Sequence, residues 1–373
     1  MQEIKKTRIV LASILKPVDD TRMFEKMGMS LLSLAHTEIH IIGFPSVLHA
    51  HSTGEDITLH PLPKFNRLSI QRMLMPWKVA RKVLALKPSL FIITTHELLP
   101  AALLVKVLTG CRLIYDVREN YFLNILHTPA FPKQLRPLLA ASVRIMEFFT
   151  SPGIDHFFLA EKAYANEINF PGKRRTILEN KLKLPAALPG RNRQQGSLAL
   201  LFSGTLAEST GVFVAVRLAS SLYQVNSSVS LTIIGYAAQQ SVLKRLKEEI
   251  KDKSFIRLIG GDVLVPHTAI LEAIQSHHAG IIAYTPGPAT VSSIPTKLYE
   301  YLGLQLPILL INYAPWVTLC EPYHAAIPFD AGAIQPEVIL KALLHTDFYT
   351  TVPENVLWES EEKVFLDVVK TLL

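Results

Sequence analysis

The sequence predicts an α/β protein with two doubly wound domains, each built on a parallel sheet. Short apolar runs alternate with stretches of helical period, a pattern typical of parallel sheets. The pattern stops once, in residues 181–197, and then restarts. The chain has 373 residues, more than the roughly 250–300 at which one core stops growing. We predict a first domain over 1–180, a linker over 181–197, a second domain over 198–352, and a C-terminal helical segment over 353–373 that can pack back on the first domain.

The first half contains five apolar runs that we expect to be strands covered on both faces. They are Arg8–Leu15, Glu38–Gly43, Leu90–Thr95, Arg112–Asp116 and His156–Leu159. Helices are expected at Asp20–Leu34, Pro76–Leu86 and Pro137–Thr150. Asp19 or Asp20 is a candidate N-cap for the first of them. Lys87-Pro88 and Ser151-Pro152-Gly153 should end the other two.

The linker carries prolines and glycines and shows no period. After it we expect the strands Leu198–Ser203, Leu231–Ile234, Phe255–Ile259, Ala279–Ala283 and Pro307–Ile311. The helices expected between them are Gly211–Leu222, Gln239–Lys251, Thr268–Ser276 and Thr296–Leu302. Ligands of such sheets bind beyond the carboxyl ends of the strands, so polar residues after strands are the first candidates for function.

Charge is unevenly distributed along the chain. Residues 1–190 carry a net charge of +10 (25 Lys and Arg against 15 Asp and Glu), which leaves −3 for the rest of the total of +7. A basic half can face nucleic acid, anionic lipid or phosphorylated small molecules. No Lys/Arg run is interleaved with aromatic residues or glycine, so we expect no nucleic-acid partner.

Targeting signals and metal motifs are not evident in the sequence. Charges and Pro100 interrupt the longest apolar stretch, Leu90–Leu108, so no spanning helix is expected. The polar N-terminal residues Met1–Arg8 lack the apolar centre of a signal peptide. The two cysteines have no metal or redox spacing. The chain has no Asp-x-Asp, and the adjacent side chains of His277-His278 diverge. These observations predict a cytoplasmic protein without a metal site.

The most informative stretch is Ser292-Ser-Ile-Pro-Thr-Lys-Leu-Tyr-Glu-Tyr-Leu-Gly303, which a Pro-led apolar run follows. It resembles GT-B glycosyltransferases, particularly glycosyltransferase family four. In that family a short helix carries a Glu, a Gly comes shortly after it, and a Pro-led apolar strand follows. Here Glu300, Gly303 and Pro307 match. The resemblance implies that Glu300 hydrogen-bonds the ribose hydroxyls of a nucleotide. Lys297, one helical turn earlier, could reach the diphosphate. The alternative is a surface Lys–Glu pair worth about 0.2–0.5 kcal/mol.

The resemblance extends to other loops of the second domain. The family's second Glu falls at Ser292, so Ser292 or Ser293 and backbone N–H groups would contact the sugar. Gly204 would let the backbone approach phosphate, but Thr205 and Thr210 stand where the family has basic residues. Gly260 and Val263 lie in the region with which relatives contact the nucleobase of the donor. For each glycine the alternative is an ordinary turn.

Two runs at strand ends of the first domain are candidates for catalysis. His96 and Glu97 end one strand, and His96 could be a general base or hydrogen-bond the sugar. Asp116 and Glu119 lie in a run that resembles the Asp-Val-His-Glu of many relatives, with Arg118 replacing the His. They could orient an acceptor hydroxyl. The alternative for His96 is a loop histidine hydrogen-bonded to the backbone. The alternative for Asp116 and Glu119 is that they only cap a helix.

A dense polar set follows the first strand, where many relatives have Gly-Gly. Lys16, Asp20 and Arg22 are candidates for acceptor binding together with Arg118, and helix capping by Asp20 is the alternative.

The segment Lys64–Lys87 is both basic and apolar. Its residues include Lys64, Phe65, Arg67, Leu68, Met73, Met75, Trp77, Lys78, Arg81 and Lys82. On the helix expected from Pro76, the basic side chains of Lys78, Arg81 and Lys82 should share a face opposite Trp77. Such a face can lie on anionic lipid, or it can be the solvated side of a helix that covers the sheet.

The resemblance implies a GT-B architecture of two facing Rossmann-like domains with an interdomain cleft. It implies a retaining, metal-independent hexosyltransferase that moves a sugar from a UDP- or GDP-sugar to a glycan or lipid-linked acceptor. No cofactor besides the donor substrate is expected. The product class would be a cell-surface polysaccharide or glycolipid, made in the cytoplasm, with the enzyme peripheral at the inner face of an anionic membrane. The alternatives are a nucleotide-sugar 2-epimerase of GT-B shape and a non-catalytic nucleotide-binding partner of a glycan assembly complex.

Overall fold

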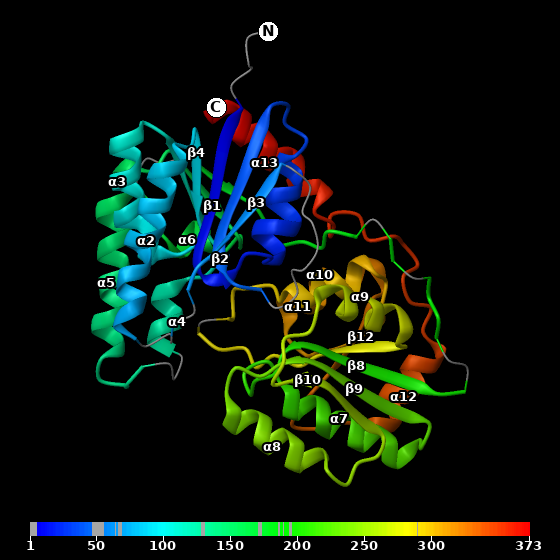
Figure 1. Ribbon diagram of the computed structural model, residues 1–373. Coiled ribbons are helices and arrows are strands. Elements are labelled where there is room, and N and C mark those ends of the chain that lie inside the picture. The colour runs from blue at the N-terminus through cyan, green and yellow to red at the C-terminus, as the bar shows by residue number, and fades with distance from the viewer. Residues whose placement is uncertain are drawn as a thin grey trace. The chain divides into compact units, whose positions relative to one another are not determined.

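A computed structural model describes residues 6–46, 56–63, 65, 69–127, 131–170, 174–185, 187–188, 190–193, 196–288 and 290–373. Lys64, Arg67 and Leu68 of the basic and apolar segment lie outside these residues. The chain forms two compact units (Figure 1). The first comprises Met1–Asn180, Pro288–Ser293 and Trp358–Leu373, and the second comprises Lys181–Gly287 and Ile294–Leu357. Among the described helices, none has the length and apolar character that crossing a membrane requires.

The first unit contains a parallel sheet with the strand order β3-β2-β1-β4-β5-β6-β7. The strands are β1 (Thr7–Pro17), β2 (Thr37–Phe44), β3 (Ile57–Pro61), β4 (Leu90–Ile93), β5 (Arg112–Val117), β6 (His156–Leu159) and β7 (Arg175–Ile177). All five predicted strands are confirmed. The edge strands β3 and β7 were not predicted, because they are short and most of their side chains are at least partly exposed.

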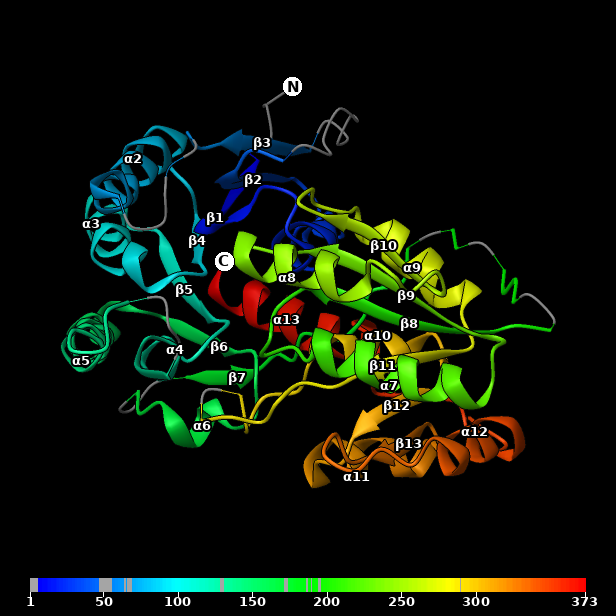
Figure 2. The ribbon, with the colours of Figure 1, turned by 90° about the horizontal axis from the view of Figure 1, so that it is seen from below.

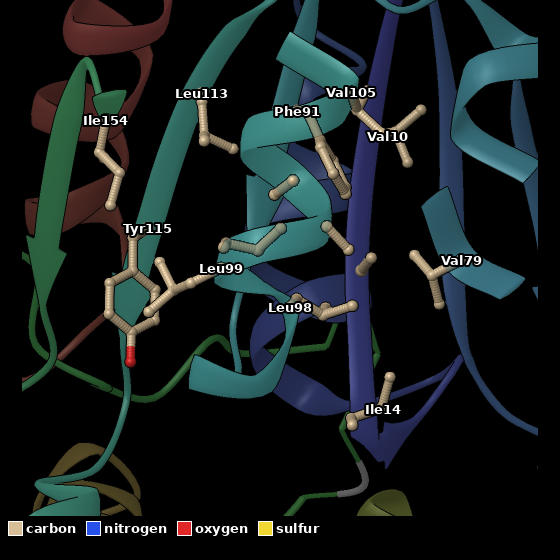
Figure 3. Close-up of a cluster of buried hydrophobic side chains, with 14 of the residues drawn as sticks. Val10, Ile14, Val79, Phe91, Leu98, Leu99, Val105, Leu113, Tyr115 and Ile154 are labelled. Atoms are coloured by element: carbon tan, nitrogen blue, oxygen red, sulfur yellow. The ribbon is translucent and has the colours of Figure 1, made fainter. Parts of the chain in front are cut away.

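Helices cover both faces of this sheet. On one face lie α2 (Ile70–Leu86), α3 (Leu99–Thr109) and α5 (Arg136–Thr150). Their side chains Val79 and Val105 meet Val10 and Phe91 of the strands in one core (Figure 3). The other face is covered by η1 (Thr21–Gly28), α1 (Met29–Leu31) and α13 (Glu359–Leu372). Shorter elements are η2 (His96–Leu98), α4 (Tyr121–His127), η3 (Ser151–Gly153) and α6 (Tyr164–Glu167).

Helix α2 begins six residues earlier than predicted, so Pro76 lies inside it. Residues 70–75 are mostly good helix formers, and the proline removes only one backbone hydrogen bond there. The expected separation of faces is wrong. Trp77 is exposed together with Lys78, Arg81 and Lys82. The predicted N-cap of the first helix is confirmed, since the Asp20 carboxylate accepts hydrogen bonds from the backbone N–H groups of Arg22 and Met23.

The second unit contains a parallel sheet with the order β10-β9-β8-β11-β12-β13. Its strands are β8 (Leu198–Thr205), β9 (Val229–Tyr236), β10 (Ile256–Gly261), β11 (Ala279–Ile282), β12 (Ile308–Ile311) and β13 (Ala326–Phe329). The five predicted strands are confirmed, and β13 is additional. Helices α7 (Val212–Val225), α8 (Gln240–Ile250) and α12 (Pro336–His345) contribute to one core. Helices α9 (His267–Ser276), α10 (Thr296–Gly303) and α11 (Ala314–Cys320), followed by η4 (Glu321–Tyr323), lie on the other face.

Both sheets reverse their strand order next to their first strand, between β1 and β4 and between β8 and β11. Such switch points are where α/β sheets bind ligands, beyond the carboxyl ends of the strands. Helix α13 belongs to the first unit, where Phe365 and Val369 share a core with Ile9 and Leu11. Residues 181–197 belong to the second unit, in which Leu182 forms a β-bridge with Leu357.

Candidate functional site

In the second unit, helix α10 places two charged side chains beside the switch point. Lys297 and Glu300 are both buried, with 9% and 7% of their surface exposed. Lys297 Nζ lies 2.7 Å from Glu300 Oε2, and His267 Nε2 of α9 lies 3.4 Å from Glu300 Oε1. Lys297 and Glu300 are therefore not the solvent-exposed surface pair that was the alternative prediction. Burying this many charged groups is costly, which favours a binding role over a merely stabilising one.

The Glu300 carboxyl remains ionised in this environment. Burial alone would raise its pKa, but Lys297 and His267 outweigh burial and lower the pKa to about 2. An ionised carboxylate has about four acceptor positions, of which Lys297 and His267 occupy two. The other positions can accept hydrogen bonds from vicinal hydroxyl groups.

Gly204, at the end of β8, lies directly against the Lys297 side chain. A Cβ atom at position 204 would be 2.7 Å from Lys297 Cε, and the φ of +105° also favours glycine. Gly211, before α7, has a φ of +81°, and a Cβ there would be 1.9 Å from the carbonyl oxygen of Ala283. The structure thus brings together two motifs that are about ninety residues apart in the sequence.

The hydroxyl groups of the β8–α7 loop differ in availability. Thr210 is buried, and its Oγ1 lies 2.7 Å from the carbonyl oxygen of Thr205 and accepts a hydrogen bond from the Ala207 N–H. Thr210 therefore holds the loop, whereas Thr205 is exposed. At the end of β10, Gly260 has a φ of +85°, and Val263, on the loop that follows, is exposed.

Ser292 and Ser293, which we predicted in the donor domain, are grouped with the first unit. Ser292 Oγ donates a hydrogen bond to the Glu167 carboxylate, and Ser293 bonds to the Tyr164 hydroxyl. Residues 283–288 and 290–295 contain no helix or strand, so the contacts of the loop, which the sequence does not reveal, decide this placement.

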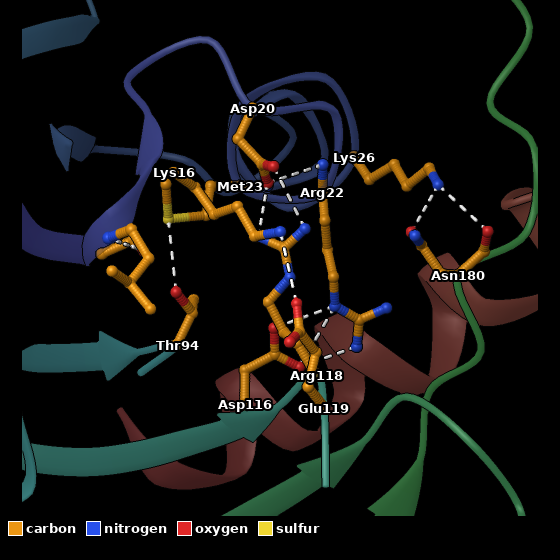
Figure 4. A network of polar contacts seen from close by, with 12 residues as sticks. Lys16, Asp20, Arg22, Met23, Lys26, Thr94, Asp116, Arg118, Glu119 and Asn180 are labelled. Atoms are coloured by element: carbon orange, nitrogen blue, oxygen red, sulfur yellow. Dashed lines mark hydrogen bonds and ion pairs between the residues drawn. The ribbon is translucent and has the colours of Figure 1, made fainter. Parts of the chain in front are cut away.

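At the switch point of the first unit, ion pairs connect the first loop with the end of β5 (Figure 4). The Arg22 guanidinium binds the Asp116 carboxylate with N–O distances of 2.7 and 2.8 Å, and both side chains are 0% exposed. Arg22 also donates to the carbonyl oxygen of Leu178. The two side chains bind each other and do not reach the surface, so the predicted acceptor contact of Arg22 and catalytic role of Asp116 remain predictions that would require this ion pair to open.

A second ion pair in this network joins Arg118 to Asp20. The two guanidinium nitrogens lie 2.6 and 3.1 Å from the carboxylate oxygens of Asp20. Burial opposes ionisation of Asp20, but Arg118 and Lys16 lower its pKa to about 2. The predicted acceptor residues Asp20 and Arg118 are thus largely occupied by each other, and the capping alternative for Asp20 is realised.

Of the remaining predicted residues of the first unit, Lys16, Glu97 and Glu119 are partly exposed, whereas His96 is buried. Lys16 Nζ and the Glu119 carboxylate, 3.4 Å apart, are each about a third exposed. His96 Nδ1 lies 3.3 Å from Glu97 Oε2 without hydrogen-bond geometry. Burial lowers the pKa of His96, which favours the neutral imidazole. A neutral imidazole can accept a proton or a hydrogen bond.

Sequence reasoning missed three partners of these residues. The Arg72 guanidinium binds the Glu97 carboxylate. The Tyr121 ring packs on His96 with the ring centroids 4.5 Å apart. His267, on α9, completes the surroundings of Glu300. No local spacing connects these partners with the residues they contact.

Acid should destabilise the first unit through Asp20. Its folded-state pKa of about 2 is below the ordinary 3.8, so its contribution to stability is full above about pH 4 and is lost as the pH falls through 2. We expect Asp20→Asn to remove about 2 kcal/mol of this pH-dependent stability. Urea unfolding between pH 6 and pH 2 measures it. An unchanged slope of unfolding free energy against pH in the variant would show that Asp20 does not supply it.

Comparison with known proteins adds information on the fold alone. No protein-family model and no curated protein sequence matches the chain. Sucrose-phosphate synthase from Thermosynechococcus elongatus superposes with a TM-score of 0.71 at 10% identity, over 98% of this chain and 99% of that chain. HepE from Anabaena, in complex with UDP and glucose, has a TM-score of 0.67 at 11% identity over 98% and 100% of the two chains. The UDP-forming α,α-trehalose-phosphate synthase from Burkholderia vietnamiensis has a TM-score of 0.65 at 12% identity over 99% of both chains.

The chain has the GT-B fold. Its two parallel Rossmann-like sheets match those of solved nucleotide-sugar glycosyltransferases over nearly the whole length. Membership of glycosyltransferase family four remains a prediction, as do the roles of the individual site residues in this GT-B protein.

Proposed function

We propose that this chain is a glycosyltransferase that takes a UDP- or GDP-sugar as donor and binds it at Lys297 and Glu300. The observation that carries the proposal is the buried group of Lys297, Glu300 and His267 next to Gly204. These three side chains lie beside the switch point between β8 and β11, where α/β sheets bind ligands. Structures of the same fold were solved with UDP and glucose and with UDP-2-fluoro glucose, which supports a nucleotide-sugar as the ligand class.

The proposed mechanism gives each donor-site residue one task. Glu300 accepts hydrogen bonds from the two ribose hydroxyls, and Lys297 turns from Glu300 toward the diphosphate. The N–H groups at the start of α7 add positive potential for the departing phosphate. The bond between the anomeric carbon and the β-phosphate oxygen breaks, and the acceptor oxygen forms the new bond to that carbon. The proton of the acceptor hydroxyl passes to the departing diphosphate. Gly260 and Val263 would face the nucleobase of the donor, and Thr205 would contact its diphosphate.

Residues of the first unit are assigned to the acceptor side. We propose that His96 and Glu97 contact the reacting groups, and that Lys16 and Glu119 bind acceptor hydroxyls. The transfer is proposed to be retaining and of the hexosyltransferase type. The acceptor would be a glycan or a lipid-linked sugar in cell-surface polysaccharide or glycolipid synthesis. The protein would work in the cytoplasm, peripheral at an anionic membrane surface.

Transfer should survive an excess of EDTA. In the proposed mechanism Lys297 and the α7 N-terminus supply the positive charge for the leaving diphosphate, and no three His, Cys, Asp or Glu side chains gather as metal ligands in the described part of the chain. Release of nucleoside diphosphate from the donor, measured with and without EDTA, checks this. Activity that is lost in EDTA and restored by Mg²⁺ or Mn²⁺ would contradict metal independence.

A non-catalytic nucleotide-binding partner of a glycan assembly complex is the second candidate. Thr205 and Thr210 carry no charge, and the Thr210 hydroxyl already bonds within its loop. A thermal-shift screen over a panel of UDP- and GDP-sugars separates the candidates. Stabilisation by one nucleotide-sugar beyond that by its nucleotide supports the transferase, whereas stabilisation by the nucleotide alone supports the partner.

A further inference from the structure

The outer side of helices α2, α3 and α5 in the first unit is apolar. These helices lie side by side, since α2 packs against α3 and α3 packs against α5 (Figure 2). The described residues include 25 exposed large apolar side chains, of which four lie on α2, three on α3 and four on α5. The apolar face consists of Ile70, Met73, Leu74, Trp77, Leu104, Val107, Leu108, Leu138, Ile145, Phe148 and Phe149.

The folded core does not explain the apolar face. Val79 and Val83 of α2 point into the core and are fully buried, whereas Val107 is 81% and Phe149 is 73% exposed. On α5, Leu138, Ile145 and Phe149 are spaced by seven and four residues, so they form one stripe along the helix. Helix α8 of the second unit shows the ordinary arrangement, with its exposed face made largely of charged side chains. An extended apolar surface on a folded chain marks an interaction site.

The charged side chains that α2, α3 and α5 themselves carry are nearly all basic. Within α2, α3 and α5 the only acidic residue is Glu147, which is buried and binds Arg144. Lys78, Arg81 and Lys82 of α2 are exposed beside Trp77. A second copy of this chain that used the same face would bring like charges together. A surface with apolar side chains and exposed cationic groups suits anionic lipid, which offers acyl chains and negative headgroups together.

We infer that the apolar face seats the protein on an anionic bilayer, with the outer side chains of α3 and α5 entering the acyl boundary and the bases of α2 contacting headgroups. The inference deepens the membrane association in the proposed function and rests on that part of it. It does not depend on the donor site. The sequence had indicated only the Lys64–Lys87 segment, whereas α3 and α5 supply seven of the eleven apolar side chains.

Sedimentation of the full chain with vesicles tests the inference. The parent should bind vesicles of phosphatidylcholine and phosphatidylglycerol and should not bind phosphatidylcholine alone. The triple variant Val107→Ser, Ile145→Ser and Phe149→Ser should weaken vesicle binding at least tenfold and keep its UDP affinity. The matched control is Val338→Ser, Leu344→Ser and Val352→Ser in the second unit, whose side chains are comparably exposed, and it should bind vesicles like the parent.

The basic side chains and Trp77 give two further readouts. Changing Lys78, Arg81 and Lys82 to Gln should remove most of the dependence of binding on salt, because exposed charges are screened within about 3 Å at 1 M ionic strength. Trp77 is the exposed one of the three tryptophans, so its emission should shift to the blue on anionic vesicles, and the Trp77→Phe variant should lose that shift.

The following outcomes would overturn the inference. The serine triple variant on α3 and α5 could bind vesicles like the parent, or its loss could be matched by the control in the second unit. The parent could ignore all vesicles and form a dimer that the triple variant abolishes, which would make a second copy the occupant. Because UDP binding is measured on the same proteins, each of these failures is distinguishable from failure of the proposed donor site.

Discussion

Replacing Asp116 with alanine is expected to lower the free energy of unfolding by about 3–5 kcal/mol. The variant leaves the Arg22 guanidinium at a fully buried position without its carboxylate. Nη1 of Arg22 already has no hydrogen-bond partner, and the remaining acceptor, the Leu178 carbonyl oxygen, carries no full negative charge. Urea or thermal unfolding of the full chain measures the loss.

Two comparisons identify the cause of that loss. Glu38→Ala breaks the Arg8–Glu38 pair on the same sheet, where both side chains are partly exposed, and should cost at most about 1 kcal/mol. Replacing both buried partners, with Arg22→Met and Asp116→Leu, should recover part of the stability because no buried charge is left alone. An Asp116→Ala protein that is as stable as the parent but no longer transfers sugar would instead support a catalytic role for Asp116.

Glu300→Gln is expected to weaken the binding of the donor's nucleotide, UDP or GDP, by about 10- to 100-fold, because hydrogen bonds to a charged acceptor contribute roughly 1.5–3 kcal/mol each. The amide keeps the size of the side chain but loses the ionised carboxylate that Lys297 and His267 surround. Calorimetric titration gives the affinity. Since Glu300 is buried, the unfolding free energy of the variant has to be measured on the same sample.

The matched control for Glu300 is Glu337→Gln, an exposed acid on α12 of the same unit. It should bind the nucleotide like the parent. An unchanged nucleotide affinity in a folded Glu300→Gln protein would remove Glu300 from the donor site. Lys297→Met is the complementary change, and it should reduce the affinity for UDP more than that for uridine, because uridine has no phosphate.

The sequence was sufficient for the architecture because each fully covered strand is apolar and each main helix has a clear period. Strands β1, β8 and β12 are of this kind. Strand β7 has three residues, none of them buried, so neither composition nor period distinguishes it from a loop. The start of α2 was misplaced because a proline usually opens a helix, whereas here it is tolerated inside one.

Less of the site was predictable. Lys297 and Glu300 lie one turn apart on one helix, so their proximity follows from sequence spacing. Arg22 and Asp116 are 94 residues apart, and only the parallel arrangement of β1, β4 and β5 brings them together. Each side chain looked like a free polar group after a strand. Without the partner in view, a buried ion pair and an acceptor site are indistinguishable.

Incubation with a panel of UDP- and GDP-sugars, followed by analysis of the products, tests the proposed function most directly. The proposal predicts that one nucleotide-sugar releases its nucleoside diphosphate, that a glycan or lipid-linked acceptor accelerates the release, and that Lys297→Met suppresses it. A nucleotide-sugar that returns epimerised at C2 with its diphosphate intact would identify an epimerase. Absence of any turnover and of any binding of UDP or GDP would contradict the donor site itself.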